Sequence, residues 1–268
     1  MSEMEVSLLS LNGEKIGKIK LPKIFKEPVR EDLILRAFLA TQSKKRQPYG
    51  TDKLAGKRTS AHYHGRRSDR WTMMNREMAR LPRIHGKGAP LHMLWQARFV
   101  PSAKGGRRAH PPKPEKVWEQ KINKKERRKA IRSALAATAI KEFVLKRGHK
   151  AEKLEELPIV VDDKIQEISK AKELVEFLKK IGLEEELKRV KKKKVRAGKG
   201  KLRGRKYKKK VGPLIVIAED KGISKAVKNL PGFDVCRVEN LSVEKLAPGA
   251  MPGRLTIFTK SALEKLGG

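Results

Sequence analysis

The sequence predicts an α/β fold, in which a mostly parallel sheet is flanked by helices in Rossmann-like layers and carries a long extended basic loop. Short β-rich segments alternate with amphipathic ones through the second half of the chain, as in layered α/β proteins. Residues 214–218 are apolar on both faces, as a buried parallel strand requires. Residues 41–114 show no sustained apolar period. We therefore expect one globular domain from 1–40 and 115–268, interrupted by the 41–114 loop and by a basic excursion at 191–210.

The chain opens with a predicted hairpin and a helix. Strands are expected at 6–9 and 15–20, because Asn12-Gly13 between them favours a tight turn. A helix should follow and end before Pro48, which lacks the backbone N–H that a helix needs. Its apolar face is formed by Leu33, Ile34, Ala37 and Phe38.

After the loop, the pattern predicts a long helix and then alternating elements. Asn123 with Glu126 three residues later has the pattern of a capping box at the start of an Ala-rich helix, which should end at 146–148. A helix with an apolar stripe should end at Gly182. The remaining expected elements are strands at 157–161, 214–218, 234–238 and 255–259, and short helices at 223–230, 242–246 and 261–266.

Positive charge is concentrated in two segments. The chain carries 66 Lys and Arg against 30 Asp and Glu, a net charge of +36. Residues 41–114 contribute +15 and residues 191–210 contribute +13, which leaves +8 for the other 174 residues. Charge at this density predicts a nucleic-acid partner. A membrane surface is not expected, because neither segment has the apolar face of a surface-lying helix.

The basic loop is expected to become ordered only against RNA. Like charges repel, and the loop has too little apolar surface to collapse on itself. Glycines such as Gly50, Gly56 and Gly86 would let RNA approach the backbone closely. Trp71 and Trp95 would stack on bases, whereas Trp118 is expected to pack on the globular domain.

The predicted RNA contacts come from both basic segments. They are Lys44, Lys45, Arg46, Lys53, Lys57, Arg58, Arg66, Arg67, Arg70, Arg76, Arg80, Arg83, Lys87, Trp95, Arg98, Lys104, Arg107, Arg108, His110, Arg196, Lys199, Lys201, Arg203, Arg205 and Lys206.

Cysteine usage and hydropathy favour a cytoplasmic protein. Cys236 is the only cysteine, so no internal disulfide can form. No signal-peptide core is recognised at the N-terminus, and no run approaches the ~20 apolar residues that span a bilayer.

No catalytic or metal-binding pattern stands out. Gly50 and Gly56-Lys57 fail the P-loop spacing, and Arg58 replaces the required hydroxyl. The spacings of the loop histidines match no zinc pattern, so these residues are expected to contact bases and phosphates. No metal site or cofactor is expected beyond Mg²⁺ held nonspecifically through RNA. The loop histidines are His62, His64, His85, His92 and His110.

Two pairs of carboxylates provide the best enzyme hypothesis. Asp162-Asp163 and Glu219-Asp220 each follow a predicted strand. If those strands are parallel neighbours, the four acids would meet at one edge of the sheet and could hold two metal ions. The simpler interpretation is that they cap helices or begin turns. A metal-dependent RNA-processing enzyme and a non-ribosomal RNA chaperone are the two alternative functions.

Several ordered motifs resemble those of one family, the large-subunit ribosomal protein four family in its archaeal and eukaryotic form. The resemblance covers nearly the whole chain. The motifs that carry it lie at 54–61, 83–88, 105–112, 132–139, 157–164, 196–201 and 246–254.

The resemblance implies a non-enzymatic protein of the cytoplasmic ribosome. It implies binding to large-subunit ribosomal RNA early in assembly, contacts with neighbouring large-subunit ribosomal proteins, and a loop at 41–114 that lines the nascent-peptide exit tunnel and meets the nascent polypeptide. The end of the chain at Gly268 favours an archaeal member. The loop is longer than in eukaryotic relatives between 65 and 80, and Arg66, Arg67 and Arg70 are the expected tip.

Overall fold

The chain divides into two compact units. The computed structural model describes residues 4–267, so the expectation drawn from Gly268 lies outside this range. Residues 4–45 together with 119–267 form one unit, here called the body, and residues 46–118 form the other, called the arm. The arm begins five residues after the start of the predicted 41–114 loop and ends four residues beyond its end.

The body is built on a six-stranded sheet with the strand order β2-β1-β3-β8-β6-β7. All neighbouring strands are parallel except β1 and β2, which form the predicted hairpin. Gly13 turns that hairpin with φ at +87°, a conformation that favours glycine. The mostly parallel sheet confirms the predicted fold class. The strands are β1 (Glu5–Leu9), β2 (Lys15–Lys20), β3 (Ile159–Val161), β6 (Leu214–Ile217), β7 (Asp234–Arg237) and β8 (Thr256–Thr259).

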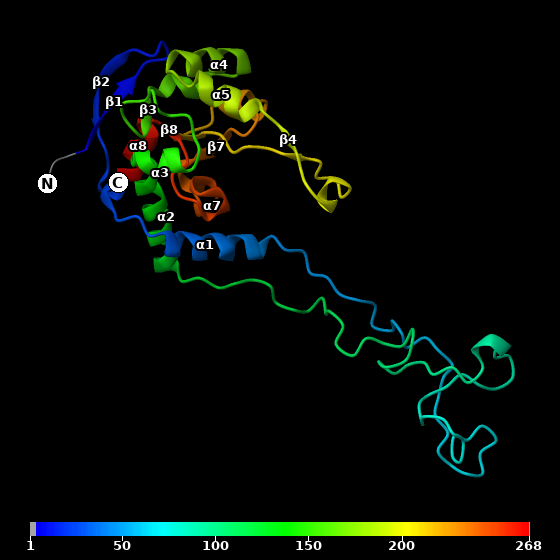
Figure 1. Ribbon diagram of the computed structural model, residues 1–268. Helices are drawn as coiled ribbons and strands as arrows, with labels where there is room; N and C mark the ends of the chain where they lie inside the picture. Colours follow the sequence, from blue (N-terminus) through cyan, green and yellow to red (C-terminus); the bar gives the residue numbers. More distant parts are fainter. Residues whose placement is uncertain (1–3, 268) are drawn as a thin grey trace. The chain divides into compact units, whose positions relative to one another are not determined.

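Helices cover both faces of the sheet (Figure 1). One face packs against α3 (Lys141–Lys146), α4 (Ala171–Lys180), α5 (Glu184–Lys191) and α6 (Ile223–Lys228). The other packs against α1 (Glu31–Lys44), α2 (Lys124–Ala139), α7 (Val243–Leu246) and α8 (Lys260–Gly267). Short 3-10 helices are η1 (Lys23–Lys26), η2 (Leu91–Met93), η3 (Asp163–Glu167), η4 (Lys199–Lys201), η5 (Val238–Asn240) and η6 (Pro248–Ala250).

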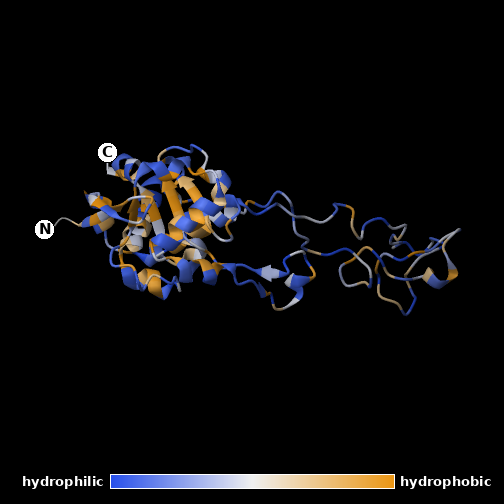
Figure 2. Ribbon diagram, turned by 90° about the horizontal axis from the view of Figure 1, so that it is seen from above, coloured by the Kyte–Doolittle hydropathy of each residue, from blue (hydrophilic) through white to orange (hydrophobic). Residues whose placement is uncertain are grey.

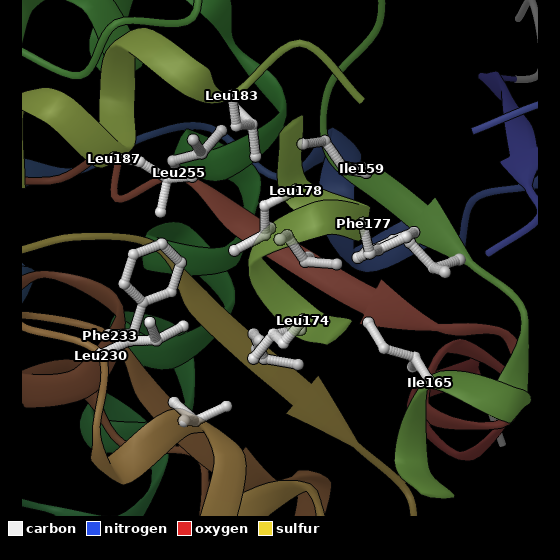
Figure 3. Packing of buried hydrophobic residues seen from close by; sticks show 14 of the residues in the cluster. Ile159, Ile165, Leu174, Phe177, Leu178, Leu183, Leu187, Leu230, Phe233 and Leu255 are labelled. Carbon is white, nitrogen blue, oxygen red and sulfur yellow. The ribbon is translucent and has the colours of Figure 1, made fainter. Parts of the chain in front are cut away.

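The hydrophobic core lies in two layers, one on each face of the sheet. Figure 2 shows the apolar strands enclosed by helices whose outer surfaces are polar. Figure 3 shows the layer in which Leu174, Phe177 and Leu178 of α4 pack against the sheet. In the other layer, Phe25 meets Phe258 edge to face at 5.7 Å between ring centroids. Each such side chain contributes about 1.5–3 kcal/mol by leaving water.

Three local predictions were wrong or incomplete. Asn123 precedes α2, but its side chain makes no capping hydrogen bond, and Glu126 instead pairs with Arg36 at 3.1 Å. The predicted long helix breaks at Ile140, whose extended backbone separates α2 from α3. Helix α5 was not predicted, because most of its residues are charged.

The second basic segment, residues 191–210, emerges from the body as a short hairpin. Strands β4 (Lys194–Val195) and β5 (Tyr207–Lys208) pair antiparallel with exposed side chains. The chain that returns to the body is held by Arg254, which is only 1% exposed. The Arg254 guanidinium donates to Gly212 O at 2.8 Å and to the Asp234 carboxylate at 2.5 Å. No helix among residues 4–267 is long and apolar enough to cross a membrane.

A polar cluster on α5, the helix that leads into this hairpin, also contacts the returning chain. The Glu186 carboxylate accepts hydrogen bonds from Arg189 at 2.6 and 2.7 Å, from His149 Nδ1 at 2.7 Å and from Lys150 N at 3.0 Å. Arg189 also donates to Val211 O at 2.6 Å. Burial alone raises the pKa of Glu186, but the hydrogen bonds from Arg189 and His149 outweigh it and lower the pKa to about 2. Burial lowers the pKa of His149.

We expect Glu186→Gln to reduce the free energy of unfolding by ~3 kcal/mol at pH 7, because the partly buried Arg189 and the buried His149 lose their charged partner. The Glu186 pKa lies below its ordinary value of 4.5. The carboxylate therefore stabilises the fold fully above pH 4.5, and this contribution is lost as the pH falls from 4.5 toward 2. The variant should not show this decrease in the free energy of unfolding between pH 4.5 and pH 2. Urea unfolding at several pH values, followed by far-UV circular dichroism, measures the difference.

Glu184→Gln is the matched control for this prediction. Glu184 lies on the same helix and pairs with Lys188 at 2.8 Å, but both side chains are exposed. Its replacement should leave the free energy of unfolding nearly unchanged, because solvent screens an exposed pair. Equal effects of the two variants would contradict a structural role for the buried cluster.

Candidate nucleic-acid interface

The two ends of the arm stack on each other. The Tyr49 and Trp118 rings lie 5.4 Å apart and nearly parallel, and the Arg46 guanidinium lies 4.1 Å above the Trp118 ring. Lys116 approaches the same ring at 4.4 Å. Trp118 was predicted to pack on the globular domain, but its ring stacks within the arm, because Tyr49 and Arg46 offer it an aromatic face and a cation.

Two glycines allow the outgoing and returning segments of the arm to run in contact. A Cβ at Gly50 would collide with Pro114, and a Cβ at Gly56 would collide with the backbone of Arg107. Thr51 N donates to Pro112 O at 3.2 Å between the same segments. Gly50 and Gly56 were predicted to admit RNA, and the structure instead uses them for contact within the arm. Open space surrounds the Cβ positions of Gly86, Gly88 and Gly198.

Arg83 organises the middle of the arm. Its backbone pairs with His62 and Ala97 in isolated antiparallel bridges. Its guanidinium donates to Ala79 O at 3.0 Å and to Trp95 O at 2.9 Å. Arg83 was predicted to contact RNA, but this side chain is half-buried and satisfies backbone carbonyls of the arm.

Aromatic and histidine rings form a small cluster beside Arg83. The His85 ring lies 5.5 Å from Trp71 and 5.8 Å from Trp95, and the Trp71 ring is nearly parallel to it. His62 and His64 lie 4.3 and 4.7 Å from His85. Burial lowers the pKa of His85, and the neighbouring His62 and His64 lower it further. No sequence pattern indicated that His85 joins the other two; the His-x-His spacing at 62–64 was the available signal.

The predicted stacking residues are engaged within the arm. Arg76 lies 4.3 Å above the Trp95 ring, and Arg70 lies 5.3 Å above Trp71. Both tryptophans are half-buried. Their remaining exposed surface is what a base could still use.

The predicted cations fall into two groups. Some have partners within the protein: Lys44 pairs with Glu119, Lys45 with Glu244 and Arg58 with Asp52, and the side chains of Arg98 and Arg196 donate to backbone carbonyls. Others are exposed and make no side-chain hydrogen bond or ion pair within residues 4–267. They are Lys53, Lys57, Arg66, Arg67, Arg80, Lys87, Lys104, Arg108, Lys199, Lys201, Arg203 and Arg205.

The carboxylates proposed for a two-metal enzyme do not form an active site. Strands β3 and β6 are not neighbours, because β8 lies between them. Asp162 accepts from Asp163 N at 2.8 Å, and Asp163 accepts from Ser261 N at 3.0 Å. Asp220 accepts from Gly222 N at 3.1 Å. The simpler interpretation is therefore correct for Asp162, Asp163 and Asp220, which cap helices or begin turns, and the Glu219 carboxylate lies 4.0 Å from the Lys265 ammonium.

A layered α/β body with a cationic, aromatic-rich arm defines a class of basic protein rather than a catalytic one. Over residues 19–268 the sequence matches the family described as "Ribosomal protein L4/L1 family", and the chain belongs to that family. It is a ribosomal protein and not an enzyme, as the motifs predicted.

Archaeal relatives match the chain over almost its full length. A protein of Methanopyrus kandleri is 49% identical over 264 residues, which are 98% of this chain and 98% of that protein. A protein of Nanoarchaeum equitans is 50% identical, over 98% and 97% of the two chains. One of Methanosphaera stadtmanae is 47% identical, over 98% and 96%. Each of the three is named "Large ribosomal subunit protein uL4".

We expect Arg83→Lys to loosen the arm without affecting the body. A single ammonium cannot reach both Ala79 O and Trp95 O, as the planar guanidinium does. The loss of one or two hydrogen bonds of ~1 kcal/mol each should speed chymotryptic cleavage near Trp95 by about 5- to 30-fold. Arg80→Lys is the control, because Arg80 is exposed. Equal cleavage rates in both variants would refute the role assigned to Arg83.

Proposed function

We propose that the chain is a structural constituent of the large ribosomal subunit, and that its arm and second basic segment bind large-subunit ribosomal RNA early in assembly. The observation that carries the proposal is an excess of exposed cations within the arm. Residues 46–118 hold 17 Lys and Arg against four acids. Such an excess has no counter-charge within the chain, and a polyanion supplies it. Neighbouring large-subunit ribosomal proteins are the expected protein partners.

Binding would combine charge neutralisation with ordering of the arm. Arg forks bind phosphates bidentately and stack on bases, whereas Lys acts as a point charge. Folded RNA is recognised largely by its shape, so no sequence-specific contact is required. With about 10 phosphate contacts, the slope of log affinity against log salt would be roughly −7 to −9.

The residues on either side of the arm contact each other and the rest of the body. The Lys44 ammonium lies 2.8 Å from Glu119, and Gln120 N donates to Ser43 Oγ at 2.9 Å. The Lys45 ammonium lies 2.6 Å from Glu244. Because the residues that flank the arm are paired with each other and with the body, a short linker can replace the arm without opening the core.

Replacement of residues 46–118 by a short Gly-Ser linker should separate folding from RNA binding. The body should keep its far-UV circular dichroism and its melting temperature within a few degrees, since the core residues are unchanged. The salt slope for purified large-subunit ribosomal RNA should shrink from roughly −8 by at least about half, because each lost phosphate contact removes almost one unit.

A matched control keeps the arm and removes three of the 13 positive charges of the second basic segment. Lys199, Lys201 and Arg203 changed to Gln should reduce the slope by about three units. An unchanged slope after arm replacement would overturn the assignment of RNA binding to the arm. Failure of tagged full-length protein to sediment with the large subunit at high salt would instead favour a non-ribosomal RNA chaperone.

We further propose that the arm reaches the nascent-peptide exit tunnel and that Arg66, Arg67 and Arg70 form its tip. These three side chains are exposed. They lie in consecutive turns, in which Asp69 N donates to Arg66 O at 3.3 Å and Thr72 N donates to Asp69 O at 3.1 Å. At a tunnel wall such a turn would act on a nascent polypeptide through shape and positive potential.

A photo-crosslinking residue at position 67 should label a stalled nascent chain in translating ribosomes, because an exposed tip lies within reach of the peptide. The same residue at position 104 is the control, since Lys104 is equally exposed but lies outside the turn. Labelling from position 104 alone would show that another part of the arm meets the peptide.

A further inference from the structure

Three histidines of the arm converge on one point. His62, His64 and His85 each offer a ring nitrogen, and these three atoms lie within 4.8 Å of one another. Two nitrogen ligands on one tetrahedral zinc ion stand about 3.3 Å apart, given Zn–N bonds of about 2.0–2.1 Å. Small ring rotations would therefore bring all three nitrogens to bonding distance.

The hydrogen bonds around two of the rings leave the facing nitrogens free to donate electron pairs. His62 Nδ1 lies 2.9 Å from Ser60 O, so this nitrogen carries the hydrogen and Nε2 carries the lone pair. His64 Nδ1 faces the Asp69 carboxylate at 3.5 Å, which favours the same tautomer. The two Nε2 atoms then face each other at 2.7 Å. At this distance either a proton on one of the two nitrogens or a metal ion shared by both must offset the repulsion of their lone pairs.

His85 provides the third ligand from a protected position. It is 7% exposed, and neither ring nitrogen has a hydrogen-bond partner among the described residues. An unsatisfied buried imidazole costs free energy, which a coordination bond would offset. The Trp71 ring stacked on it fixes its orientation.

We propose that His62, His64 and His85 form a zinc site that cross-links the arm. The net positive charge of the arm repels cations. Only a metal ion that forms strong coordination bonds with imidazole would therefore bind here. Mg²⁺ and Ca²⁺ prefer oxygen ligands and are disfavoured. Asp69, through His64 Nδ1, is the positioning residue that orients the ligand. A water molecule would complete the tetrahedron.

The site would restrict the turns proposed as the tip. Coordination joins His64 to His85 and closes the segment that contains Arg66, Arg67 and Arg70. Closing this segment lowers the conformational entropy that the arm loses when it meets RNA. The zinc site does not depend on the proposed RNA binding, because it can be measured on the free chain.

Zinc binding to the full-length, metal-stripped protein tests the proposal, with competition against a chromogenic chelator as the readout. We expect one Zn²⁺ per chain with Kd below about 1 µM, and visible absorption bands of tetrahedral Co²⁺ when cobalt is used instead. His85→Ala should weaken binding at least about 100-fold, and Asp69→Asn about 10- to 100-fold. Tryptophan fluorescence should change on binding, because Trp71 stacks on His85.

His92→Ala and His110→Ala are matched controls, because both histidines are exposed and lie in the arm but outside the cluster. Both should bind zinc like the unmodified chain. Far-UV circular dichroism checks that every variant keeps its folded body. A Kd above about 10 µM, or an affinity unchanged in His85→Ala, would overturn the proposal and leave the cluster as a stacking arrangement only.

Discussion

Repulsion between unpaired cations is the constraint on which the architecture depends. The body neutralises its charges locally, as in the pair of the buried Arg254 with the exposed Asp234 and the pair of Lys45 with Glu244. The arm has few acids to do the same. A segment with this charge has too little apolar surface for a large hydrophobic core, so it forms a compact unit of its own. Partition of charge between the units allows one chain to combine a stable domain with a densely cationic segment.

The arm achieves local order without regular secondary structure beyond one short 3-10 helix among its residues. Backbone bridges around Arg83 and the stacked rings of Trp71, His85 and Trp95 replace helix and sheet ladders. Trp95 adopts a left-handed backbone conformation with φ at 63°, which is strained for a residue with a side chain. Few contacts hold this arrangement. An external partner that adds contacts, such as the proposed RNA or metal ion, would therefore change the conformation of the arm.

Buried polar groups have a different role in the body. Glu186 and His149 are buried and form a network with the partly exposed Arg189, and Arg254 donates to the backbone carbonyls of Gly212 and Lys245. These groups add little net stability compared with apolar residues of the same volume, but the loss of one partner is costly. Their position at the base of the second basic segment fixes where that segment leaves the body. Arg189 and Arg254 do so by donating to Val211 O and Gly212 O, where the segment returns to the body.

The sequence alone determined most of the elements and where the positive charge is concentrated, because those depend on local signals. The Asn12-Gly13 turn, the apolar run at 214–218 and the concentration of Lys and Arg each act within a few residues. Tertiary structure decided what depends on contacts between distant segments. It placed β8 between β3 and β6, which separates the carboxylates, and it brought His85 to His62 and His64. It also directed Arg83 toward carbonyls of its own arm, because backbone pairing places those acceptors within reach.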